Sequence, residues 1–217
     1  MSLVEKYRPS TWTEVVGQSA ALAKLDLIRQ RSGLSGRAYW ISGKSGTGKS
    51  TIADLIASEV ASEICIQELT AGSLTRSNLL ELEREYRTFG FGGKRGRAYI
   101  VNEAHRLSRE AIGALLDMLD DKRLLKHVVW IFTTTIEGQA TLFDDKCDSG
   151  ALLSRCDSIR LRLDAELDYA LRLQRIAQSE GLDGQPVTAY CRLIREHDFN
   201  LRSAIKAIEG GEMMVQP

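Results

Sequence analysis

A glycine-rich stretch in the first quarter of the chain has the residue types and spacing of a loop that binds nucleotide phosphates. Residues 43–50 are Gly-Lys-Ser-Gly-Thr-Gly-Lys-Ser, which matches the pattern G-x-x-x-x-G-K-[ST] at every fixed position. Glycines let the backbone curl so that successive N–H groups converge on a phosphate, and the following helix N-terminus adds positive potential. We expect Lys49 to reach the β- and γ-phosphates and the Ser50 hydroxyl to ligate Mg²⁺. The expected nucleotide contacts are Ser45, Gly46, Thr47, Gly48, Lys49, Ser50 and Thr51.

A second chemical element is the pair Asn102-Glu103, which follows the apolar residues 98–101. In phosphate-loop ATPases the first position of this pair is usually an aspartate that orients a Mg²⁺-bound water, and the glutamate polarises the attacking water. Glu103 is therefore the expected catalytic carboxylate. Asn102 can contact the metal through a water but brings no charge, and this loss should weaken Mg²⁺ positioning in the transition state. Either Glu103 and Ser50 suffice for slower hydrolysis, or the chain is a nucleotide-binding subunit that barely turns over.

Short apolar runs that alternate with helical patterns must position these loops. The expected strands are residues 38–42, 64–67, 98–101, 128–132 and 158–161. The expected helices between them are residues 49–61, a helix from a cap at Thr75 or Ser77 to residue 86, and a helix from a cap at Ser108 to residue 119. This alternation predicts an α/β fold with a parallel five-stranded sheet sandwiched by helices.

The strand signal ends near residue 163. Three amphipathic helices are expected beyond it: one over residues 167–177, one that begins at Pro186 and ends near Glu196, and one that Asn200 caps over residues 201–209. We therefore expect a nucleotide-binding α/β core at residues 1–163 and a small helical lid domain at residues 164–217.

Composition excludes several classes of protein. The 29 basic residues balance 29 acidic ones, which argues against a protein that coats nucleic acid, although a local basic surface is compatible with this balance. No apolar run approaches the roughly 18 residues of a membrane span, and the charged N-terminus is no signal peptide, so we expect a cytoplasmic protein with no membrane partner. The four cysteines lack C-x-x-C spacing and the three histidines are scattered, which argues against a zinc ribbon or a histidine cluster.

The opening Leu-Val-Glu-Lys-Tyr-Arg-Pro at residues 3–9, followed by Val-Val-Gly-Gln at residues 15–18, resembles the start of sliding-clamp loader subunits of the AAA+ ATPases. The other stretches that carry the resemblance are the phosphate loop, Asn-Glu-Ala-His at 102–105, Leu-Ser-Arg-Cys at 153–156, and Asn-Leu-Arg-Ser-Ala-Ile at 200–205. The resemblance covers about residues 3–210 and extends to both the replication factor C and the DNA polymerase III gamma branches. It implies the AAA+ P-loop NTPase fold, with ATP and Mg²⁺ as cofactors.

The resemblance also implies roles for residues outside the phosphate loop. The adenine pocket would be lined by Tyr7, Arg8, Pro9, Val16 and Gly17. Thr135, or its neighbour Thr134, would sense the γ-phosphate, and Arg202 would contact the nucleotide from the lid. Arg155 would act in trans in a neighbouring subunit, where a cation stabilises charge that develops on the γ-phosphoryl oxygens. The implied active unit is an oligomer with ATP at its subunit boundaries.

These residues together predict a clamp-loader-like ATPase subunit that hydrolyses ATP slowly to drive assembly on DNA and clamp loading in DNA replication. Its expected partners are neighbouring AAA+ subunits, a sliding clamp and primer–template DNA, at the nucleoid or, in a eukaryote, in the nucleus. Two alternatives stay open: a nucleotide-gated scaffold subunit that does not hydrolyse ATP, and another DNA-remodelling AAA+ motor such as a branch-migration ATPase. The opening and S-R-C motifs argue against the second.

Three further features complete the expectations. Residues 84–97 contain five basic residues and one acidic residue, so this loop could contact DNA or a partner through Phe89 or Phe91, or could be a solvated hairpin. The pair Asp144-Asp145 is expected in an exposed loop without a metal. Clamp-loader subunits usually continue into a helical collar domain, and we expect no collar here, in either a truncated chain or a compact relative.

Overall fold

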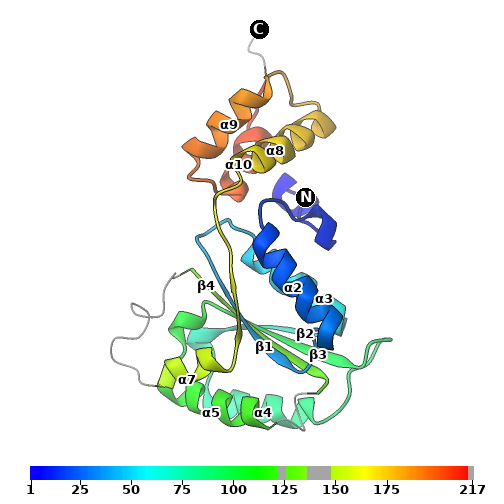
Figure 1. The fold of residues 1–217 in the computed structure, drawn as a ribbon, viewed down its shortest axis with the longest axis vertical. Helices are drawn as coiled ribbons and strands as arrows, with labels where there is room; N and C mark the ends of the chain where they lie inside the picture. Colours follow the sequence, from blue (N-terminus) through cyan, green and yellow to red (C-terminus); the bar gives the residue numbers. More distant parts are fainter. Residues whose placement is uncertain (122–125, 136–147, 215–217) are drawn as a thin grey trace.

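The computed structural model describes residues 1–121, 126–135 and 148–214 of the chain (Figure 1). At its centre lies a five-stranded sheet in the order β2-β3-β4-β1-β5, and all neighbouring strands run parallel. The strands are β1 (Arg37–Ser42), β2 (Ala61–Thr70), β3 (Gly96–Asn102), β4 (Val128–Thr134) and β5 (Asp157–Arg160). The predicted α/β fold is therefore confirmed, and β2 is longer than the segment expected at residues 64–67.

Helices connect the strands because parallel neighbours cannot be joined by a tight turn. The connecting helices are α3 (Lys49–Val60), α4 (Arg76–Tyr86), α5 (Arg109–Asp120) and α7 (Asp148–Ser154), with the 3-10 turns η2 (Ala71–Ser73) and η3 (Ala104–Arg106). Before the first strand lie α1 (Leu3–Lys6), the 3-10 turn η1 (Trp12–Glu14) and α2 (Ser19–Ser32). Thr75 and Ser108 cap α4 and α5 by accepting a backbone N–H with their hydroxyl groups. Of the two caps proposed for α4, Thr75 is thus the one present.

Side chains of the sheet alternate between two helical layers, as the period of a strand requires. Tyr39 and Ile41 of β1 belong to the hydrophobic cluster under α2 and α3, whereas Trp40 belongs to the cluster with α4, α5 and α7 (Figure 1). Trp130 of β4 is fully buried between Tyr99 and Phe132, with ring centroids 4.7 and 6.1 Å away. Burial on both faces explains why the three central strands β1, β3 and β4 are nearly continuous apolar runs.

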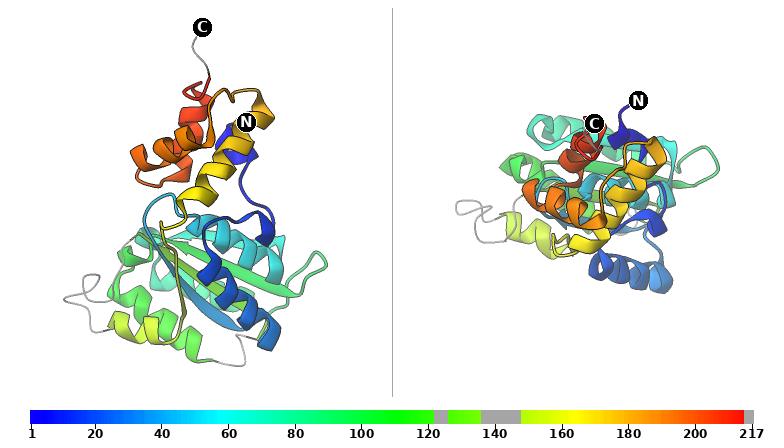
Figure 2. Two further views of the ribbon diagram at one scale, coloured as in Figure 1. Left: turned by 45° about the horizontal axis from the view of Figure 1, so that its top comes forward. Right: turned by 90° about the horizontal axis from the view of Figure 1, so that it is seen from above.

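Three helices follow the last strand and form a separate hydrophobic cluster above the sheet (Figures 1 and 2). They are α8 (Glu166–Glu180), α9 (Val187–Glu196) and α10 (Leu201–Glu209). Leu3 of α1 belongs to the same cluster, and its backbone N–H donates to the Glu209 carboxylate at 3.2 Å. The first residues of the chain therefore pack against its last helices.

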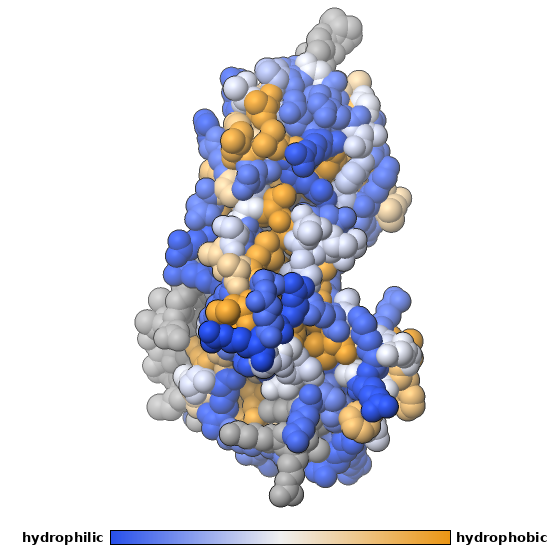
Figure 3. Space-filling model, turned by 45° about the vertical axis from the view of Figure 1, so that its right-hand side comes forward, coloured by the Kyte–Doolittle hydropathy of each residue, from blue (hydrophilic) through white to orange (hydrophobic). Residues whose placement is uncertain are grey.

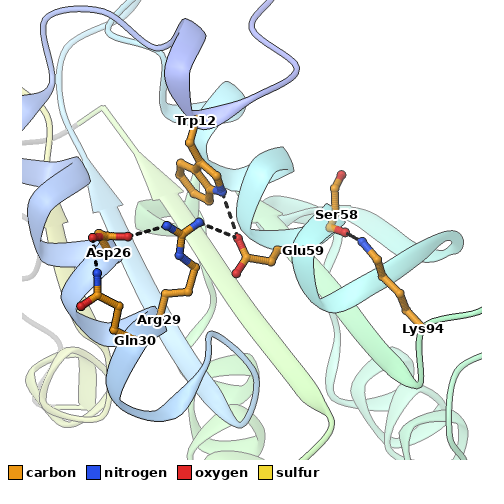
Figure 4. Close-up of polar contacts among 7 residues, drawn as sticks. All are labelled: Trp12, Asp26, Arg29, Gln30, Ser58, Glu59 and Lys94. Atoms are coloured by element: carbon orange, nitrogen blue, oxygen red, sulfur yellow. Dashed lines mark hydrogen bonds and ion pairs between the residues drawn. The ribbon is translucent and has the colours of Figure 1, made fainter.

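A polar network ties the outer ends of α2 and α3 to the turn η1 (Figure 4). The indole N–H of Trp12 donates to Glu59 at 2.9 Å, and Arg29, which also pairs with Asp26, lies 3.8 Å from the same carboxylate. On the other side of α3, Lys94 donates to the backbone carbonyl of Ser58. These groups are largely exposed, so each pair contributes at most about 1 kcal/mol and mainly fixes orientation.

The space-filling view shows a hollow in the outline between the three upper helices and the sheet below them (Figure 3). The chain runs from one body to the other through residues 161–165, after β5 (Figure 1). In the described ranges, no helix combines the length and the apolar character that crossing a bilayer would require.

Candidate nucleotide-binding site

The glycine-rich loop joins β1 to α3, as the sequence predicted. Gly48 precedes the first residue of α3 with a φ of 93°, and Gly46 has a φ of 81°, a backbone region that side-chain-bearing residues rarely adopt. The Lys49 ammonium lies across the loop and donates to the carbonyl oxygens of Gly43 and Lys44 at 2.7 and 2.8 Å. The loop thus gathers a helix N-terminus and one cation, which together favour a bound anion.

One cavity of about 600 Å³ brings together most of the residues singled out from the sequence. The predicted residues that line it are Tyr7, Arg8, Pro9, Val16, Ser45, Gly46, Thr47, Gly48, Lys49, Ser50, Thr51, Asn102, Glu103, Thr135 and Arg202. They come from the N-terminal segment, the loop, the ends of β3 and β4, and the start of α10. The cavity size is in the range of small-molecule sites. Gly17, Arg155 and the alternative sensor Thr134 lie outside it.

Gly17 lies beside the cavity and packs against the three-helix body. Its φ is 69°, and a Cβ at this position would come within 2.4 Å of the Tyr169 ring. The structure therefore explains the glycine by close packing on α8, whereas its part in an adenine pocket stays a prediction.

The end of β3 places an amide and a carboxylate at the cavity. Asn102 accepts a hydrogen bond from the Thr133 hydroxyl at 2.9 Å, and its amide nitrogen donates to the Glu68 carboxylate at 3.3 Å. Glu103 has a φ of 55° and a side chain that is 44% exposed, and His105 Nε2 lies 3.4 Å from Glu103 Oε2. A non-glycine residue at positive φ costs of order 1 kcal/mol, so the fold holds Glu103 in this orientation against local preference.

The two candidate threonines after β4 lie in different surroundings. Thr134 is completely buried, and its hydroxyl lies 3.2 Å from His105 Nδ1. Thr135 is half-buried and lines the cavity. Of the two, Thr135 is the one placed where a bound phosphate could be contacted.

The N-terminus of α10 faces the phosphate loop. Asn200 caps this helix by accepting the backbone N–H groups of Arg202 and Ser203 at 3.1 and 3.3 Å. A Cβ at Gly46 would lie 2.0 Å from the Asn200 side-chain oxygen, so the loop and the helix are in direct contact. Lys206, one turn after Arg202, lines the same cavity and adds a second cation from α10.

A buried polar network around Gln18 joins the phosphate loop, the segment of residues 161–165 and the three-helix body. The Gln18 side chain is 4% exposed; its nitrogen donates to the Arg162 carbonyl at 2.8 Å and to the Tyr169 hydroxyl at 2.9 Å. Its oxygen accepts the Arg162 backbone N–H at 3.1 Å, and its nitrogen lies 3.5 Å from the Thr47 carbonyl. Burial raises the pKa of Tyr169 to about 12, which keeps the hydroxyl protonated.

The N-terminal segment is fastened to both bodies next to the cavity. Tyr7 and Lys6 donate to the Glu180 carboxylate of α8, and these hydrogen bonds lower the pKa of Glu180. Arg8 forms an ion pair with Asp54 of α3. Sequence patterns did not indicate these contacts, because they join residues more than forty positions apart.

Arg155 lies at the opposite end of the sheet, near the beginnings of β1 and β5. Its guanidinium makes two hydrogen bonds of 2.7 Å to the two oxygens of Asp120, within a second cavity of about 620 Å³. The six-residue strand β1 alone separates the two ends by about 20 Å, so Arg155 cannot reach the phosphate loop of its own chain. Burial raises the pKa of the adjacent Cys156 thiol to about 12, which makes it unreactive as a nucleophile.

The basic loop of residues 84–97 is the other segment for which the sequence predicted a possible contact. The loop between α4 and β3 projects from the edge of the sheet and exposes Phe89 and Phe91 (Figure 1). The Arg95 guanidinium lies 6.0 Å from the Phe89 ring, and Arg97 donates to the Thr88 carbonyl, so two of its cations have partners within the loop. A contact with DNA stays a prediction. Asp144 and Asp145 lie outside the described residues.

Comparison with known proteins gives a family match. The model of the "ATPase family associated with various cellular activities (AAA)" matches residues 39–161. DNA polymerase III subunit tau of Escherichia coli is 30% identical over 244 aligned positions, covering 98% of this chain and 35% of that protein. DNA polymerase III subunit gamma/tau of Mycoplasma genitalium is 27% identical, covering 83% of this chain and 35% of that protein. The chain thus spans about a third of the length of these curated relatives.

Solved structures show the same fold. RuvB, described as a Holliday junction branch migration motor of Thermotoga maritima, superposes with a TM-score of 0.72. The match covers 94% of this chain and 64% of that chain, with 20% sequence identity. Identity this low speaks for the shared architecture alone.

Proposed function

Because the chain belongs to the AAA family of ATPases, we propose that it is a clamp-loader-like subunit that binds ATP with Mg²⁺ in the cavity beneath α10. Slow hydrolysis there drives assembly on DNA and the loading of a sliding clamp during replication. The observation that carries this proposal is the convergence of the phosphate loop, the pair Asn102-Glu103 and Arg202 on one cavity. Homology to DNA polymerase III subunit tau over 98% of the chain supports the replication context.

The chain's own groups account for nucleotide binding. Backbone N–H groups of the loop and the first turn of α3 hold the β-phosphate, and Lys49 exchanges its carbonyl partners for phosphate oxygens. Arg202 approaches the phosphates from α10, and Tyr7 and Arg8 lie where the base would pack. Arg172 and Lys206, which the sequence did not single out, add positive charge to the lining and favour a polyanion.

The oxygen donors at the cavity fit a magnesium ion. Mg²⁺ in phosphate-transfer sites is typically held by one or two protein oxygens together with substrate phosphates and waters. Ser50 offers a hydroxyl, and Asn102 offers an amide oxygen that can hold a metal-bound water. When bound, Mg²⁺ neutralises charge that develops on the phosphates.

Hydrolysis uses residues from two chains. Glu103 polarises the attacking water, and its orientation is set by the strained backbone and by His105. Thr135 contacts the γ-phosphate from the end of β4. Arg155 of a neighbouring subunit stabilises charge on the γ-phosphoryl oxygens, because its own chain holds it at the far end of the sheet.

The three C-terminal helices act as a lid in this proposal, with residues 1–163 as the nucleotide-binding core and residues 164–217 as the lid domain. The Asn200–Gly46 contact joins the lid to the loop directly, and the Gln18 network joins them through the Gln18 side chain. Nucleotide in the cavity would therefore bias the angle between lid and core, and the neighbouring AAA+ subunits, the clamp and primer–template DNA would respond to that angle. The protein would work in the cytoplasm, at the nucleoid.

The test is steady-state ATPase activity, measured for the protein alone, with primed DNA, and with primed DNA plus a sliding clamp. We expect a low basal rate that primed DNA and clamp together raise at least about tenfold, because assembly brings Arg155 to the site. Gel filtration with and without ATP should show nucleotide-dependent association. A rate that neither partner changes, in a protein that binds ATP, would contradict the clamp-loader assignment and leave a nucleotide-gated scaffold as the function.

A further inference from the structure

The amide of Asn102 has one orientation that its two neighbours allow. Thr133 donates its hydroxyl proton to the amide oxygen at 2.9 Å, and the amide nitrogen donates to Glu68 at 3.3 Å. An ionised carboxylate only accepts hydrogen bonds, so a flipped amide would set two acceptor oxygens against each other. Glu68 therefore keeps the Asn102 oxygen on the side of Thr133. Asn102 and Thr133 both line the cavity.

Glu68 reaches this position from the neighbouring strand. It lies near the end of β2, which pairs in parallel with β3 so that Thr70 is opposite Asn102 and Glu68 is opposite Ile100. The field of its carboxylate also reaches α3: burial raises the pKa of Asp54, the Arg8 guanidinium opposes that rise, and the charge of Glu68 adds to it. Glu68 is exposed, and its carboxylate contacts Asn102, which lines the cavity.

The pair accounts for the missing acid at position 102. An aspartate there would place a second carboxylate about as close to Glu68 as the amide nitrogen is now, and two carboxylates at that distance do not both ionise readily. Asparagine removes the repulsion and gains a hydrogen bond to a charged acceptor, which is stronger than one between neutral groups. The acid that faces position 102 therefore comes from β2, in addition to the Glu103 carboxylate that follows β3.

We propose that Glu68 is a positioning residue of the magnesium site, which orients the Asn102 amide and supplies the negative charge that position 102 lacks. The proposal rests on the binding of ATP with Mg²⁺ put forward above. It assigns to Glu68 no direct contact with nucleotide or metal. Its effect acts through Asn102 and through the electrostatic field at the cavity, as outer partners of metal ligands do.

The decisive experiment exchanges the charge between the two positions. ATP affinity is measured by isothermal titration in Mg²⁺ and in excess EDTA, together with the Mg²⁺ concentration that gives half-maximal ATPase activity. The variants are Glu68→Gln, Asn102→Asp and the double variant that carries both changes. Glu63→Gln is the matched control, since Glu63 is an exposed glutamate on the same strand.

We expect Glu68→Gln to raise the Mg²⁺ requirement about tenfold, in line with the effect of outer-shell partners, while ATP affinity in EDTA and the Glu63→Gln control stay unchanged. Asn102→Asp alone should not lower the Mg²⁺ requirement, because the new carboxylate faces the carboxylate of Glu68. The double variant should return to within about threefold of the wild type, since it restores one negative charge to the pair formed by positions 68 and 102. A residue with a purely structural role would not be rescued by an acid at a different position.

Three results would overturn the proposal. In the first, Glu68→Gln behaves like the Glu63→Gln control. In the second, Glu68→Gln loses ATP affinity equally in Mg²⁺ and in EDTA, and adding Asn102→Asp does not restore it. In the third, Asn102→Asp alone lowers the Mg²⁺ requirement. Wild-type protein that binds no ATP in either buffer would refute the proposed function itself. That outcome is separate from the other three, in which the wild type binds ATP.

Discussion

At the residue scale, the loop lysine has an unusual set of partners for a charged group. Lys49 donates to two carbonyl oxygens of its own loop, which are weaker partners than the oxygens of a phosphate dianion. The ammonium is thus kept within the loop and half-buried. When Lys49 binds a phosphate, little side-chain conformational entropy is lost, because the loop already restricts the lysine rotamer.

Replacement of this lysine by alanine should therefore abolish ATP binding. We expect Lys49→Ala to lower ATP affinity by at least about a hundredfold in isothermal titration, because the loss of one partner leaves phosphate charge unpaired in a partly dry site. Lys44→Ala is the control: Lys44 is an exposed lysine of the same loop, and its removal should change affinity less than threefold. ATP affinity retained by Lys49→Ala would rule out this loop as the phosphate site.

At the element scale, the N-terminal segment couples the cavity to α8. Lys6 and Tyr7 donate to Glu180, the Arg172 guanidinium donates to the Tyr7 carbonyl at 3.2 Å, and Leu3 is buried among the lid helices. The N-terminal segment is thus held in place by Arg172 and Glu180, two side chains of α8. Because Arg8 also pairs with Asp54 of α3, the segment links the three C-terminal helices to the core beside the cavity.

Acid should loosen this attachment in a defined direction. Hydrogen bonds from Lys6 and Tyr7 lower the pKa of Glu180 below its ordinary value of 4.5, so the folded state binds this proton less readily than the unfolded chain. Its stabilisation is present above pH 4.5 and disappears as the pH falls through the folded-state pKa. Glu180→Gln should consequently have a lower melting temperature than the wild type near neutral pH, and the two should converge in acid.

Differential scanning calorimetry from pH 7 to pH 3 measures this convergence. Glu196→Gln, at an exposed glutamate of α9, serves as the control and should parallel the wild type over the whole range. A constant difference in melting temperature between Glu180→Gln and the wild type at every pH would show that the carboxylate acts through packing and not through its charge.

At the scale of the whole molecule, the cavity and Arg155 lie at opposite ends of the sheet. The phosphate loop follows the end of β1, whereas Arg155 lies beside its beginning. Asp120 holds the guanidinium through both of its oxygens, and the Ala151 carbonyl accepts a third hydrogen bond at 3.0 Å. An arginine held at this end of the sheet is too far away to contact the nucleotide of its own chain, and its action in a neighbouring subunit stays a prediction.

A mixture of two inactive variants tests this arrangement. Arg155→Ala and Glu103→Gln should each lower ATPase activity about a hundredfold or more, the first through loss of transition-state charge stabilisation and the second through loss of the catalytic carboxylate. Equal mixtures should recover part of the activity, because some interfaces combine an intact Glu103 with an intact Arg155. If the mixtures stay as inactive as the separate variants, Arg155 does not act across the interface.

Some features could be predicted from the sequence because they depend on neighbours along the chain. The glycine spacing determines the loop, the apolar runs determine the strands, and the hydroxyl and amide caps determine where α4, α5 and α10 begin. All five strands and the three C-terminal helices were predictable in this way. Their boundaries shifted most at β2, where the exposed residues of an edge strand dilute the apolar signal.

Only the tertiary structure decided which distant side chains meet. The Glu68–Asn102 pair depends on the order and register of β2 and β3, the Gln18–Tyr169 bond depends on how the lid docks, and the Arg155–Asp120 pair depends on how α7 packs on α5. No local pattern encodes these contacts, because strand order and docking angle follow from packing of the whole core. The sequence alone determined a phosphate-binding α/β protein with an unusual asparagine at position 102, and the fold placed a glutamate beside that asparagine.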